Sequence, residues 1–433
     1  MSIGTPRAAI PDATRFPDEG SVRRATPTRA DLIAGISVAL VLIPQAIAYA
    51  ALAGLPPQVG LLAAALPPIV ASAFGSSTVL QTGPVALTSL LTLGMLSSRA
   101  ELGSSEFVAL AALLAVLIGL IRIGIGAAKL GHIAFVMTKP IVVGFTTGAA
   151  LLIMSSQIPT AAGRTGLDGH VLGRAMLTIA EPTAWHLGAA GLAIGAMATV
   201  LGGRTIDRRI PGVLIVVITA LAVSAAFGYA GPTVGELPTD WPQLSLDLPW
   251  TLLVGLLPAA LVMAVVDFAE PAAIARKYAD EDNTRWDANR EFIGQGAANL
   301  ASGLSGGYPV GGSFSRSSLS HMLGATSRWT GIVSGVAVLA FLPFSGVLSR
   351  LPNAALAGII IVAVAGLFEP RTIAAMWTRR RGDALVALTT FALTIITAPR
   401  IDRAIVAAVG LELGLRGYRL LRKRMQRANV TQR

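Results

Sequence analysis

The segment QTGPVALTS at residues 81–89 interrupts an apolar run in the first half of the chain with glycine and proline. A second segment, GGYPVGGSFSRSS at residues 306–318, interrupts an apolar run in the second half in the same way. After each interruption the chain resumes as a short stretch that carries serine or threonine. Because unwound backbone is tolerated at membrane depth only where it lines a cavity, matched interruptions in two halves indicate a transporter binding site.

The composition of the chain indicates a membrane protein. Hydrophobic residues make up 53% of the 433 residues, charged residues make up 13%, and the mean hydropathy is +0.67. A soluble domain of this length does not need that much apolar surface to fill a core. The sequence therefore predicts an all-α polytopic membrane protein, in which each span needs roughly 20 apolar residues.

Fourteen apolar segments are expected to cross the membrane, and the two that contain or follow the interruptions are short. Residues 1–28 are expected to form a disordered cytoplasmic tail, and residues 421–433 a basic cytoplasmic tail. Between these tails, the expected spans are 32–50, 58–74, 84–97 (short), 105–123, 134–157, 185–201, 211–228, 251–275, 292–305, 314–323 (short), 329–348, 353–368, 383–398 and 403–420.

Arginine and lysine gather in the connections that face the cytoplasm if the N-terminus is inside. The connection 229–249, on the opposite side, contains acidic residues but no lysine or arginine. This positive-inside pattern predicts a multi-pass protein of the inner (plasma) membrane with both termini in the cytoplasm. The net charge of +11 then reflects topology and contact with anionic lipid rather than nucleic-acid binding. The basic residues are Arg204, Arg208, Arg209, Arg276, Lys277, Arg285, Arg290, Arg371, Arg379, Arg380, Arg381 and those of the tail 416–427.

Signatures of enzymes and of metal sites are absent from the sequence. No lysine is followed by serine or threonine, so the chain has no phosphate-binding G-x-x-x-x-G-K-[ST] loop. Residues 311–315 lack the final glycine of a nucleophile elbow, and the chain contains no cysteine. The sequence therefore predicts neither an enzyme nor a cofactor or metal site. The histidines, which lack metal-ligand spacing, are His132, His170, His186 and His321.

Two carboxylates, Asp267 and Glu270, lie within the expected span 251–275. If Pro258 opens the helix, Glu270 lies about 18 Å along the axis, near the midplane, with Asp267 one turn earlier on the same face. Neighbouring carboxylates in a low dielectric resist joint ionisation, so at least one can bind and release a proton. We expect a site role in proton coupling; the alternative is that either residue caps a broken helix or pairs with an arginine.

Arg316 stands at the start of the short segment 314–323. A helix N-terminus presents unpaired amides and the positive end of a dipole, and a guanidinium placed there builds an anion site. The short helix that begins near Pro84 is expected to direct its N-terminus to the same place. Two converging positive ends favour a small anion. The alternative is that Arg316 neutralises Glu270, and both arrangements are compatible.

Several motifs together resemble the SulP/SLC26 family of anion transporters, the sulfate permease family. The first expected span carries DLIAG at 31–35 and LIPQAIAYA at 42–50, followed by AGLPP at 53–57. The resemblance covers about residues 29–420. It continues through 82–86, 139–145, 270–276, 289–299, 312–317 and 351–357.

The resemblance implies fourteen spans in a seven-plus-seven inverted repeat with two half-helices. It implies a core domain formed by 29–128 and 250–348, and a gate domain formed by 129–249 and 349–420. It also implies a homodimer. Family members usually continue into a cytoplasmic STAS domain, which this sequence is expected to lack because it stops soon after its last span; either the gene lacks that domain or the sequence is truncated.

Carried over position by position, the resemblance places a set of residues from both halves at the anion site. Val85 and Ala86 would contribute backbone, and the others would contribute side chains. Pro271, directly after Glu270, departs from the family pattern and puts the local geometry there in question. The implied site residues are Gln45, Tyr49, Val85, Ala86, Glu270, Ser315 and Arg316.

The interrupted segments and the resemblance together predict a secondary active transporter of a small anion, and the resemblance implies an anion of the sulfate, bicarbonate or dicarboxylate class. Elevator-type alternating access with proton symport is expected, and Na⁺ is the other candidate coupling ion. An uncoupled exchanger or channel and a Na⁺-coupled bicarbonate transporter are the alternatives. The carboxylate beside the anion argues against a channel, since a pore gains nothing from a titratable group there. A nucleobase or urate carrier fits the Ser315-Arg316 pair less well.

Overall fold

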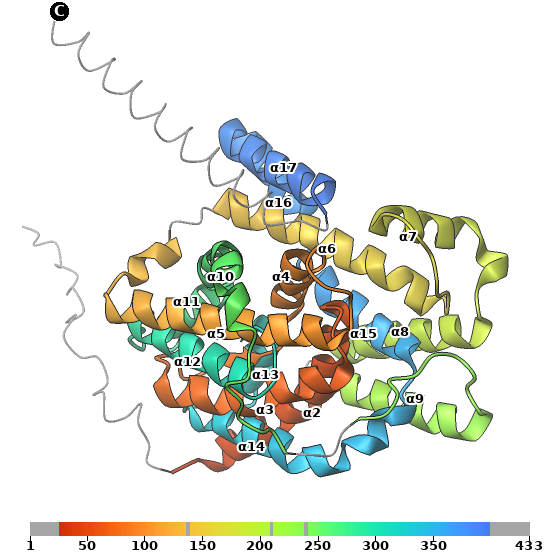
Figure 1. Ribbon diagram of the computed structural model, residues 1–433, viewed down its shortest axis with the longest axis horizontal. Coiled ribbons are helices and arrows are strands. Elements are labelled where there is room, and N and C mark those ends of the chain that lie inside the picture. The colour runs from red at the N-terminus through yellow and green to blue at the C-terminus, as the bar shows by residue number, and fades with distance from the viewer. Residues whose placement is uncertain (1–25, 136–138, 208–210, 238–240, 399–433) are drawn as a thin grey trace, which may run out of the picture.

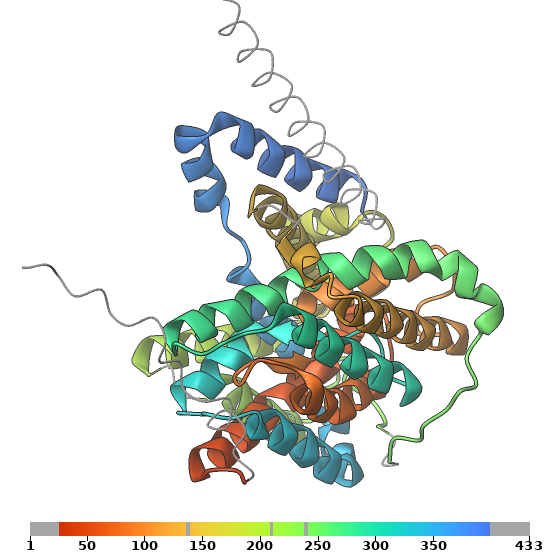
Figure 2. The same cartoon turned by 90° about the vertical axis from the view of Figure 1, so that its left-hand side faces the viewer.

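The computed structural model describes residues 26–135, 139–207, 211–237 and 241–398. Helices make up almost all of this part of the chain, and they pack around a shared apolar interior (Figure 1 and Figure 2). Seven helices within the described ranges are long and apolar enough to cross a membrane. On the outside of the molecule, Leu187 and Phe227 are 84% and 83% exposed. Large apolar side chains with this exposure suit a surface that contacts lipid.

The first half of the chain starts with two long helices joined by a tight turn. Thr28 caps the first of them: its hydroxyl accepts a hydrogen bond from the backbone N–H of Asp31, and the Asp31 carboxylate accepts one from the N–H of Thr28. The elements are α2 (Arg29–Leu52), α3 (Pro57–Phe74), β1 (Gln81–Gly83), α4 (Ala86–Leu96), α5 (Ser105–Ala127), the 3₁₀ turn Gly131–Phe135, α6 (Lys139–Ala161), α7 (Val171–Ala180), the 3₁₀ turn Pro182–Ala184, α8 (Leu187–Ile206) and α9 (Gly212–Phe227).

The second half repeats the order of a long segment, a strand and a short helix. Its elements are the 3₁₀ turn Trp250–Leu252, α10 (Leu253–Val266), α11 (Ala269–Glu281), α12 (Ala288–Leu304), β2 (Gly311–Ser313), α13 (Phe314–Met322), α14 (Trp329–Phe341), the 3₁₀ helix Leu342–Arg350, α15 (Asn353–Ala365), α16 (Pro370–Arg379) and α17 (Arg381–Ile396).

The two interrupted segments meet at the centre of the molecule. Strands β1 and β2 pair antiparallel, with Gln81 opposite Ser313 and Gly83 opposite Gly311. Every residue of both strands is buried. The strand pairing satisfies backbone groups that unwinding leaves free, which is the condition for irregular backbone inside a membrane protein. A short helix follows each strand, so α4 and α13 both begin at this pair.

Helices from the two halves pack closely where both carry glycine. α5 crosses α12 at Gly119 and Gly296. A Cβ on Gly119 would lie 2.7 Å from the backbone oxygen of Gly296, and a Cβ on Gly296 would lie 2.8 Å from that of Gly119. Small residues permit this approach of two backbones, which is a common mode of helix association in membranes.

The helices contact one another in two sets. In one set, α12 packs against α3 and α5, α14 packs against α2 and α3, and α10 packs against α5. In the other set, α6 packs against α15 and α17, and α8 packs against α9 and α15. Contacts of α2 with α15 and of α4 with α6 connect the two sets.

The expected span 251–275 is two helices rather than one. α10 begins at Leu253, so Pro258 lies inside it, and the prediction that Pro258 opens the helix is wrong. The residues before Pro258 are apolar and largely helix-favouring, so the helix starts before the proline.

Pro271 explains why the segment breaks after Val266. In one continuous helix, the ring of Pro271 would clash with the carbonyl of Asp267, four residues earlier. Instead α11 starts at Ala269, and Pro271 falls in its first turn, where a missing N–H costs no hydrogen bond. Asp267 ends α10 and Glu270 lies in the first turn of α11. Because Asp267 and Phe268 keep right-handed helical backbone angles, the two carboxylates remain about one turn apart within one candidate membrane span, Trp250–Glu281.

Other expected spans differ from the structure in detail. The segment 329–348 is helical to Phe341 and then continues as a 3₁₀ helix to Arg350. The amphipathic helices α7 and α16 were not expected, because each has only ten residues and lacks the continuous apolar run of a membrane span. The last expected span, 403–420, and the tails 1–25 and 421–433 lie outside the described residues.

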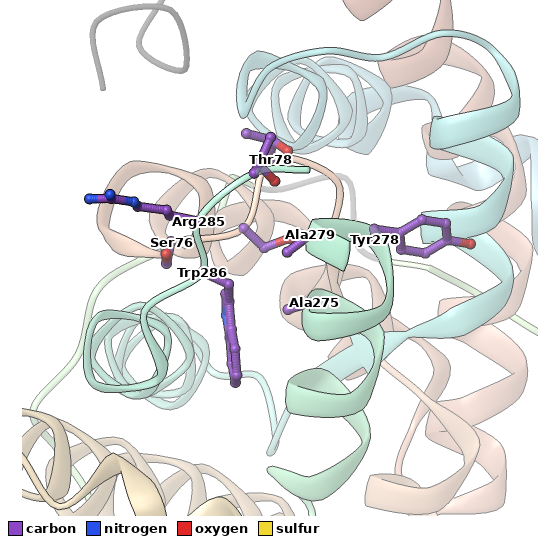
Figure 3. A pocket seen from close by; sticks show the side chains of 9 residues that line it. Ser76, Thr78, Ala275, Tyr278, Ala279, Arg285 and Trp286 are labelled. Carbon is purple, nitrogen blue, oxygen red and sulfur yellow. The ribbon is translucent and has the colours of Figure 1, made fainter. Parts of the chain in front are cut away.

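Glu291 at the start of α12 holds the loop that leads into β1. Its carboxylate accepts hydrogen bonds from the backbone N–H groups of Ser76 and Ser77, at 3.1 and 2.8 Å. Beside this loop lies a cavity of about 10 Å³, bordered by Tyr278 and Trp286 among others (Figure 3). That volume is enough for about one water molecule. The cavity is therefore too small to be the anion site.

Candidate functional site

Arg316 is the charged residue at the centre of the predicted site, and it is buried with 1% of its surface exposed. The hydroxyl of Ser313 caps α13 by accepting a hydrogen bond from the backbone N–H of Arg316. The Nη1 of the guanidinium donates to Oε1 of Gln45 at 3.1 Å. Its Nε and Nη2 have no hydrogen-bond partner among the described residues. Donors of a buried charge are costly to leave unpaired, so the geometry suits an anion at these two nitrogens.

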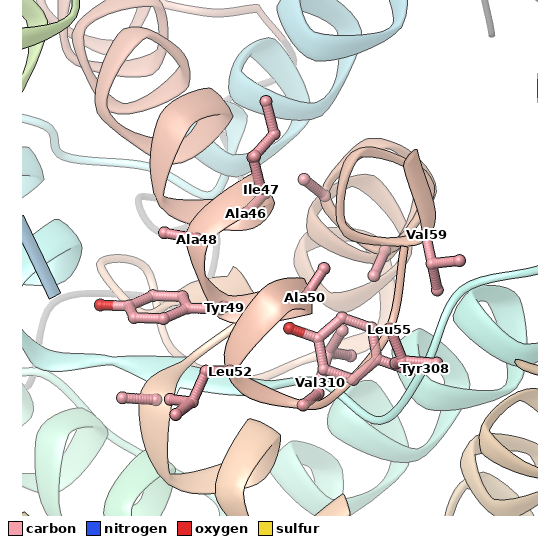
Figure 4. Close-up of a cluster of buried hydrophobic side chains, with 14 of the residues drawn as sticks. Ala46, Ile47, Ala48, Tyr49, Ala50, Leu52, Leu55, Val59, Tyr308 and Val310 are labelled. Atoms are coloured by element: carbon pink, nitrogen blue, oxygen red, sulfur yellow. The ribbon is translucent and has the colours of Figure 1, made fainter. Parts of the chain in front are cut away.

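The α2 helix places Gln45 and Tyr49 on one side of Arg316. The two residues are one turn apart and therefore share a face of the helix. Both are buried, and Tyr49 interacts electrostatically with the guanidinium. Figure 4 shows Tyr49 on α2 and, nearby, Tyr308 beside Leu55. Hydroxyl and amide groups are thus available around the arginine within an otherwise apolar core.

The start of α4 supplies the backbone part of the site. Val85 is the N-cap residue of α4, and no side chain caps this helix end. The first N–H groups of a helix have no acceptor within the helix, so they are available for an anion. Val85 and Ala86 are buried with 6% exposure each. The prediction that this part of the chain offers backbone donors is consistent with the uncapped end.

Gly83 brings the backbone of β1 close to the arginine. Its φ of 152° is a conformation that side-chain-bearing residues rarely adopt. A Cβ at this position would lie 3.4 Å from Nη2 of Arg316 and 3.4 Å from a methyl carbon of Leu42. Glycine therefore leaves room for one of the two unpartnered nitrogens.

Glu270 lies in the first turn of α11 and is partly buried. Its carboxylate interacts with the backbone N–H of Phe314, the residue that starts α13, and with the charge of Arg316. Within the described residues, no ion pair shorter than 4 Å joins Glu270 to Arg316. The arrangement puts a carboxylate near the arginine but leaves Nε and Nη2 of the guanidinium without a hydrogen-bond partner among the described residues.

Ser315 occupies a different position from its neighbour. Its side chain is exposed, and its hydroxyl lies 3.3 Å from that of Ser313. It is thus at the edge of the site, whereas Arg316 is inside it. Of the other predicted side chains, Gln45 is hydrogen-bonded to Arg316, and Tyr49 and Glu270 interact with it electrostatically.

Asp267 is held by a buried network next to Gly311 of β2, where an added Cβ would lie 3.2 Å from either oxygen of the carboxylate. Its Oδ2 lies 2.8 Å from Nη2 of Arg122, and its Oδ1 accepts a hydrogen bond from the hydroxyl of Thr88. Arg122 also donates from Nε to the backbone oxygen of Ala264. This corresponds to the alternative that the carboxylate pairs with an arginine. The network joins α4, α5 and α10.

Arg122 was missed by the sequence reasoning. The expected span ended at 123, which placed this arginine at a membrane boundary, where a charge needs no partner. In the structure α5 continues to Ala127, and Arg122 is completely buried. An arginine five residues before the end of an extended apolar helix was the available signal.

A buried arginine with free donors, an uncapped helix N-terminus and a carboxylate, gathered where two membrane segments are interrupted, define a membrane transport protein for anions. The family model described as the sulfate permease family matches residues 28–390 of the chain. The chain belongs to this family, SulP/SLC26, whose members are transporters rather than enzymes.

Curated relatives match along most of the chain. A probable sulfate transporter of Mycobacterium tuberculosis is 33% identical over 392 residues, which cover 89% of this chain and 69% of that protein. The putative sulfate transporter YvdB of Bacillus subtilis is 31% identical over 392 residues, covering 88% and 72%. Solute carrier family 26 member 6 of Homo sapiens is 30% identical over 411 residues, covering 88% and 53%.

Solved structures show the same fold. The murine Slc26a9 anion transporter in the inward-facing state gives a TM-score of 0.83 at 19% identity, covering 95% of this chain and 74% of that one. The transmembrane domain of the cyanobacterial bicarbonate transporter BicA gives 0.75 at 20% identity, covering 88% and 97%. The chain is therefore a mostly helical, multi-pass membrane protein with the SLC26-type fold.

Proposed function

We propose that this protein is a secondary active transporter of a small anion, and that the anion binds at Arg316 between the starts of α4 and α13. The observation that carries the proposal is the pair of unpartnered nitrogens, Nε and Nη2, on a guanidinium with 1% exposure. A guanidinium presents its donors as a planar fork, which suits two oxygens of one anion. Small oxyanions have this geometry.

The relatives favour sulfate and bicarbonate as the first anions to test. The names of the Mycobacterium tuberculosis and Bacillus subtilis relatives specify sulfate, and that of BicA specifies bicarbonate. Both are small oxyanions that can accept hydrogen bonds from Nε and Nη2 of Arg316 and from backbone N–H groups at Ala86. Dicarboxylates are the third class in the proposal.

Proton symport through Glu270 is the proposed coupling. A negative carboxylate near the arginine opposes an arriving anion, and protonation removes that charge. The proton and the anion then favour each other's binding, and by linkage the effect is reciprocal. Asp267 is the weaker candidate for this role because Arg122 and Thr88 already engage both of its oxygens.

Alternating access by an elevator motion is the proposed transport mechanism. The set of helices that includes α2, α3, α5, α10, α12 and α14 would move as the core domain, and the set that includes α6, α8, α9, α15 and α17 would form the gate. The denser contacts within each set than between them support this division. We further propose a homodimer in the inner membrane with cytoplasmic termini.

Flux in proteoliposomes tests the proposed function. Uptake of labelled sulfate, bicarbonate, chloride and a dicarboxylate would be measured with an imposed pH gradient, with an imposed Na⁺ gradient, and with neither. Concentrative uptake of one small oxyanion driven by the proton gradient supports the proposal. Concentrative uptake driven by the Na⁺ gradient instead would show that the transporter couples the anion to Na⁺ and not to protons. Flux that never exceeds equilibrium indicates an uncoupled exchanger or a channel.

A further inference from the structure

A second cavity, of about 220 Å³, lies at the C-terminal ends of α2 and α4. Leu52 of α2 and Leu90 of α4 line one side of it. Gln157 and Thr160 of α6 and Arg174 of α7 line the other side. The cavity therefore lies between the two sets of helices. The charge pattern of the sequence assigns this end of the molecule to the outside of the membrane.

Arg174 is the one charged residue among the described residues that line this cavity. Its Nε is buried and has no hydrogen-bond partner. No carboxylate of the described residues lies within 4 Å of its guanidinium. A desolvated donor on a charged group without a counter-charge is unfavourable, so an anion in the cavity would relieve the cost.

The helix that carries Arg174 is fixed at its far end. Nη2 of Arg164 lies 2.9 Å from Oε2 of Glu181, and the indole N–H of Trp185 donates to the backbone oxygen of Thr178 at 2.7 Å. These contacts hold α7 against the end of α6. The position of Arg174 is thus set before any ligand arrives, which lowers the ordering cost of binding.

Polar groups of α6 face the same cavity. Ser156, Gln157 and Thr160 line it, and the amide nitrogen of Gln157 lies 3.0 Å from the hydroxyl of Ser156. Hydroxyl and amide groups can donate hydrogen bonds to an anion that the arginine attracts. A positive charge with neutral donors in a small cavity between apolar walls selects a small inorganic anion over a cation.

We propose that this cavity is a second anion-binding site, in which Arg174 and the polar groups of α6 hold a small inorganic anion before it reaches Arg316. This second site rests on the proposed function, which supplies the direction in which the anion moves toward Arg316. α4 connects the two sites: seven residues separate Ala86 from Leu93, which is about 10 Å along a helix. Since both helix sets form the walls, a displacement of one set against the other would change the site, so its occupancy is coupled to conformation.

The absence of cysteine from the chain allows a direct test of occupancy. Val171→Cys places a single thiol in the lining of the cavity. Its rate of alkylation by an uncharged maleimide would be measured on the full-length protein as sulfate, and separately chloride, replaces gluconate at constant ionic strength. We expect either anion to slow alkylation severalfold. The control is Met176→Cys on the same helix, which is 69% exposed and outside the cavity, and its rate should not change.

Two further variants, each combined with Val171→Cys, show which arginine binds the anion that protects the thiol. Protection of the Val171→Cys thiol should disappear with Arg174→Gln and persist with Arg316→Ala. Protection that survives Arg174→Gln, or that is lost with Arg316→Ala, would overturn the second site, because the thiol would then report the central site. Absence of protection by both anions would also overturn it. The proposed function fails separately, if Arg316→Ala binds and transports like the wild type.

Transport kinetics give an independent readout. Arg174→Gln should raise the KM for the external anion severalfold and leave kcat unchanged, and Arg174→Lys should restore part of the loss. The matched control is Arg99→Gln, which removes the same charge from the connection after α4 at the same end of the molecule; this exposed arginine lies outside the cavity lining and donates to the backbone oxygen of Gly255. An equal rise of KM in both variants would assign the effect to general surface charge and contradict the site.

Discussion

Arg122 of α5 and Asp267 at the end of α10 form a buried ion pair, with Nη2 of the arginine 2.8 Å from Oδ2 of the aspartate. The pair lies next to Gly311 of β2, and the Thr88 hydroxyl of α4 donates a further hydrogen bond to Asp267. Removing one charge of such a pair leaves the other charge buried and uncompensated. The pair therefore positions the two helices that surround the site, and its loss should affect folding.

We expect Asp267→Asn to lower the free energy of unfolding by about 3–5 kcal/mol, because Arg122 keeps its charge without a partner. Thermal unfolding of the purified protein in detergent would measure the loss. The double variant Arg122→Met with Asp267→Leu removes both charges, so it should cost less than the two single changes added together. A single variant as stable as the wild type would show that the pair is not structural.

Arg316→Ala should weaken anion binding by about 1.5–3 kcal/mol, which is roughly a 10- to 150-fold rise in Kd, because a charged hydrogen-bond donor is lost. Titration of the purified protein with the transported anion would measure Kd. Arg316→Lys serves as the matched variant, because it keeps the charge but loses the planar arrangement of donors. Its Kd should lie between those of the wild type and of Arg316→Ala. Unchanged affinity in a folded Arg316→Ala protein would contradict the proposal that the anion binds at Arg316.

Gly83→Val should abolish transport while the protein still folds and inserts. The backbone at this residue has a φ of 152°, and the added atoms would meet Nη2 of Arg316 and the side chain of Leu42. Uptake into proteoliposomes is the measurement. The control is Gly195→Val in α8, where a Cβ meets nothing within 4 Å. Normal uptake by Gly83→Val would mean that close approach at β1 is unimportant for transport.

Glu270→Gln should keep anion binding but lose concentrative uptake driven by a proton gradient, since the amide mimics the protonated carboxyl and cannot release a proton. Wild-type uptake should rise as the external side is acidified, whereas uptake by the variant should not respond. Asp280→Asn is the control, because this carboxylate lies on the same helix with 76% of its side chain exposed. A Gln variant that still accumulates the anion against its gradient would instead make Glu270 a structural neighbour of Arg316.

The membrane class and the succession of helices could be predicted from the sequence, and Arg316 could be singled out as a candidate site residue. Apolar composition, and the glycine and proline that end a helix, act over a few residues and can be read along the chain. Arg316 was identifiable because a charge beside such an interruption is rare in a membrane segment. The family motifs carried the prediction on to Gln45 and Tyr49, whose side chains the structure places beside it.

Contacts between distant parts of the chain were decided only by the tertiary structure. Arg122 and Asp267 are 145 residues apart, and no local pattern indicates that they pair. The same is true of the register that sets Gly83 opposite Gly311, and of the cavity that brings α4 next to Arg174. The role of Pro271 also depends on the structure. In the sequence it is only a departure from a motif, whereas the structure places it in the first turn of α11. Local propensity fixes where helices begin and end, but packing against other helices determines which buried charges find partners and which are left free to bind an anion.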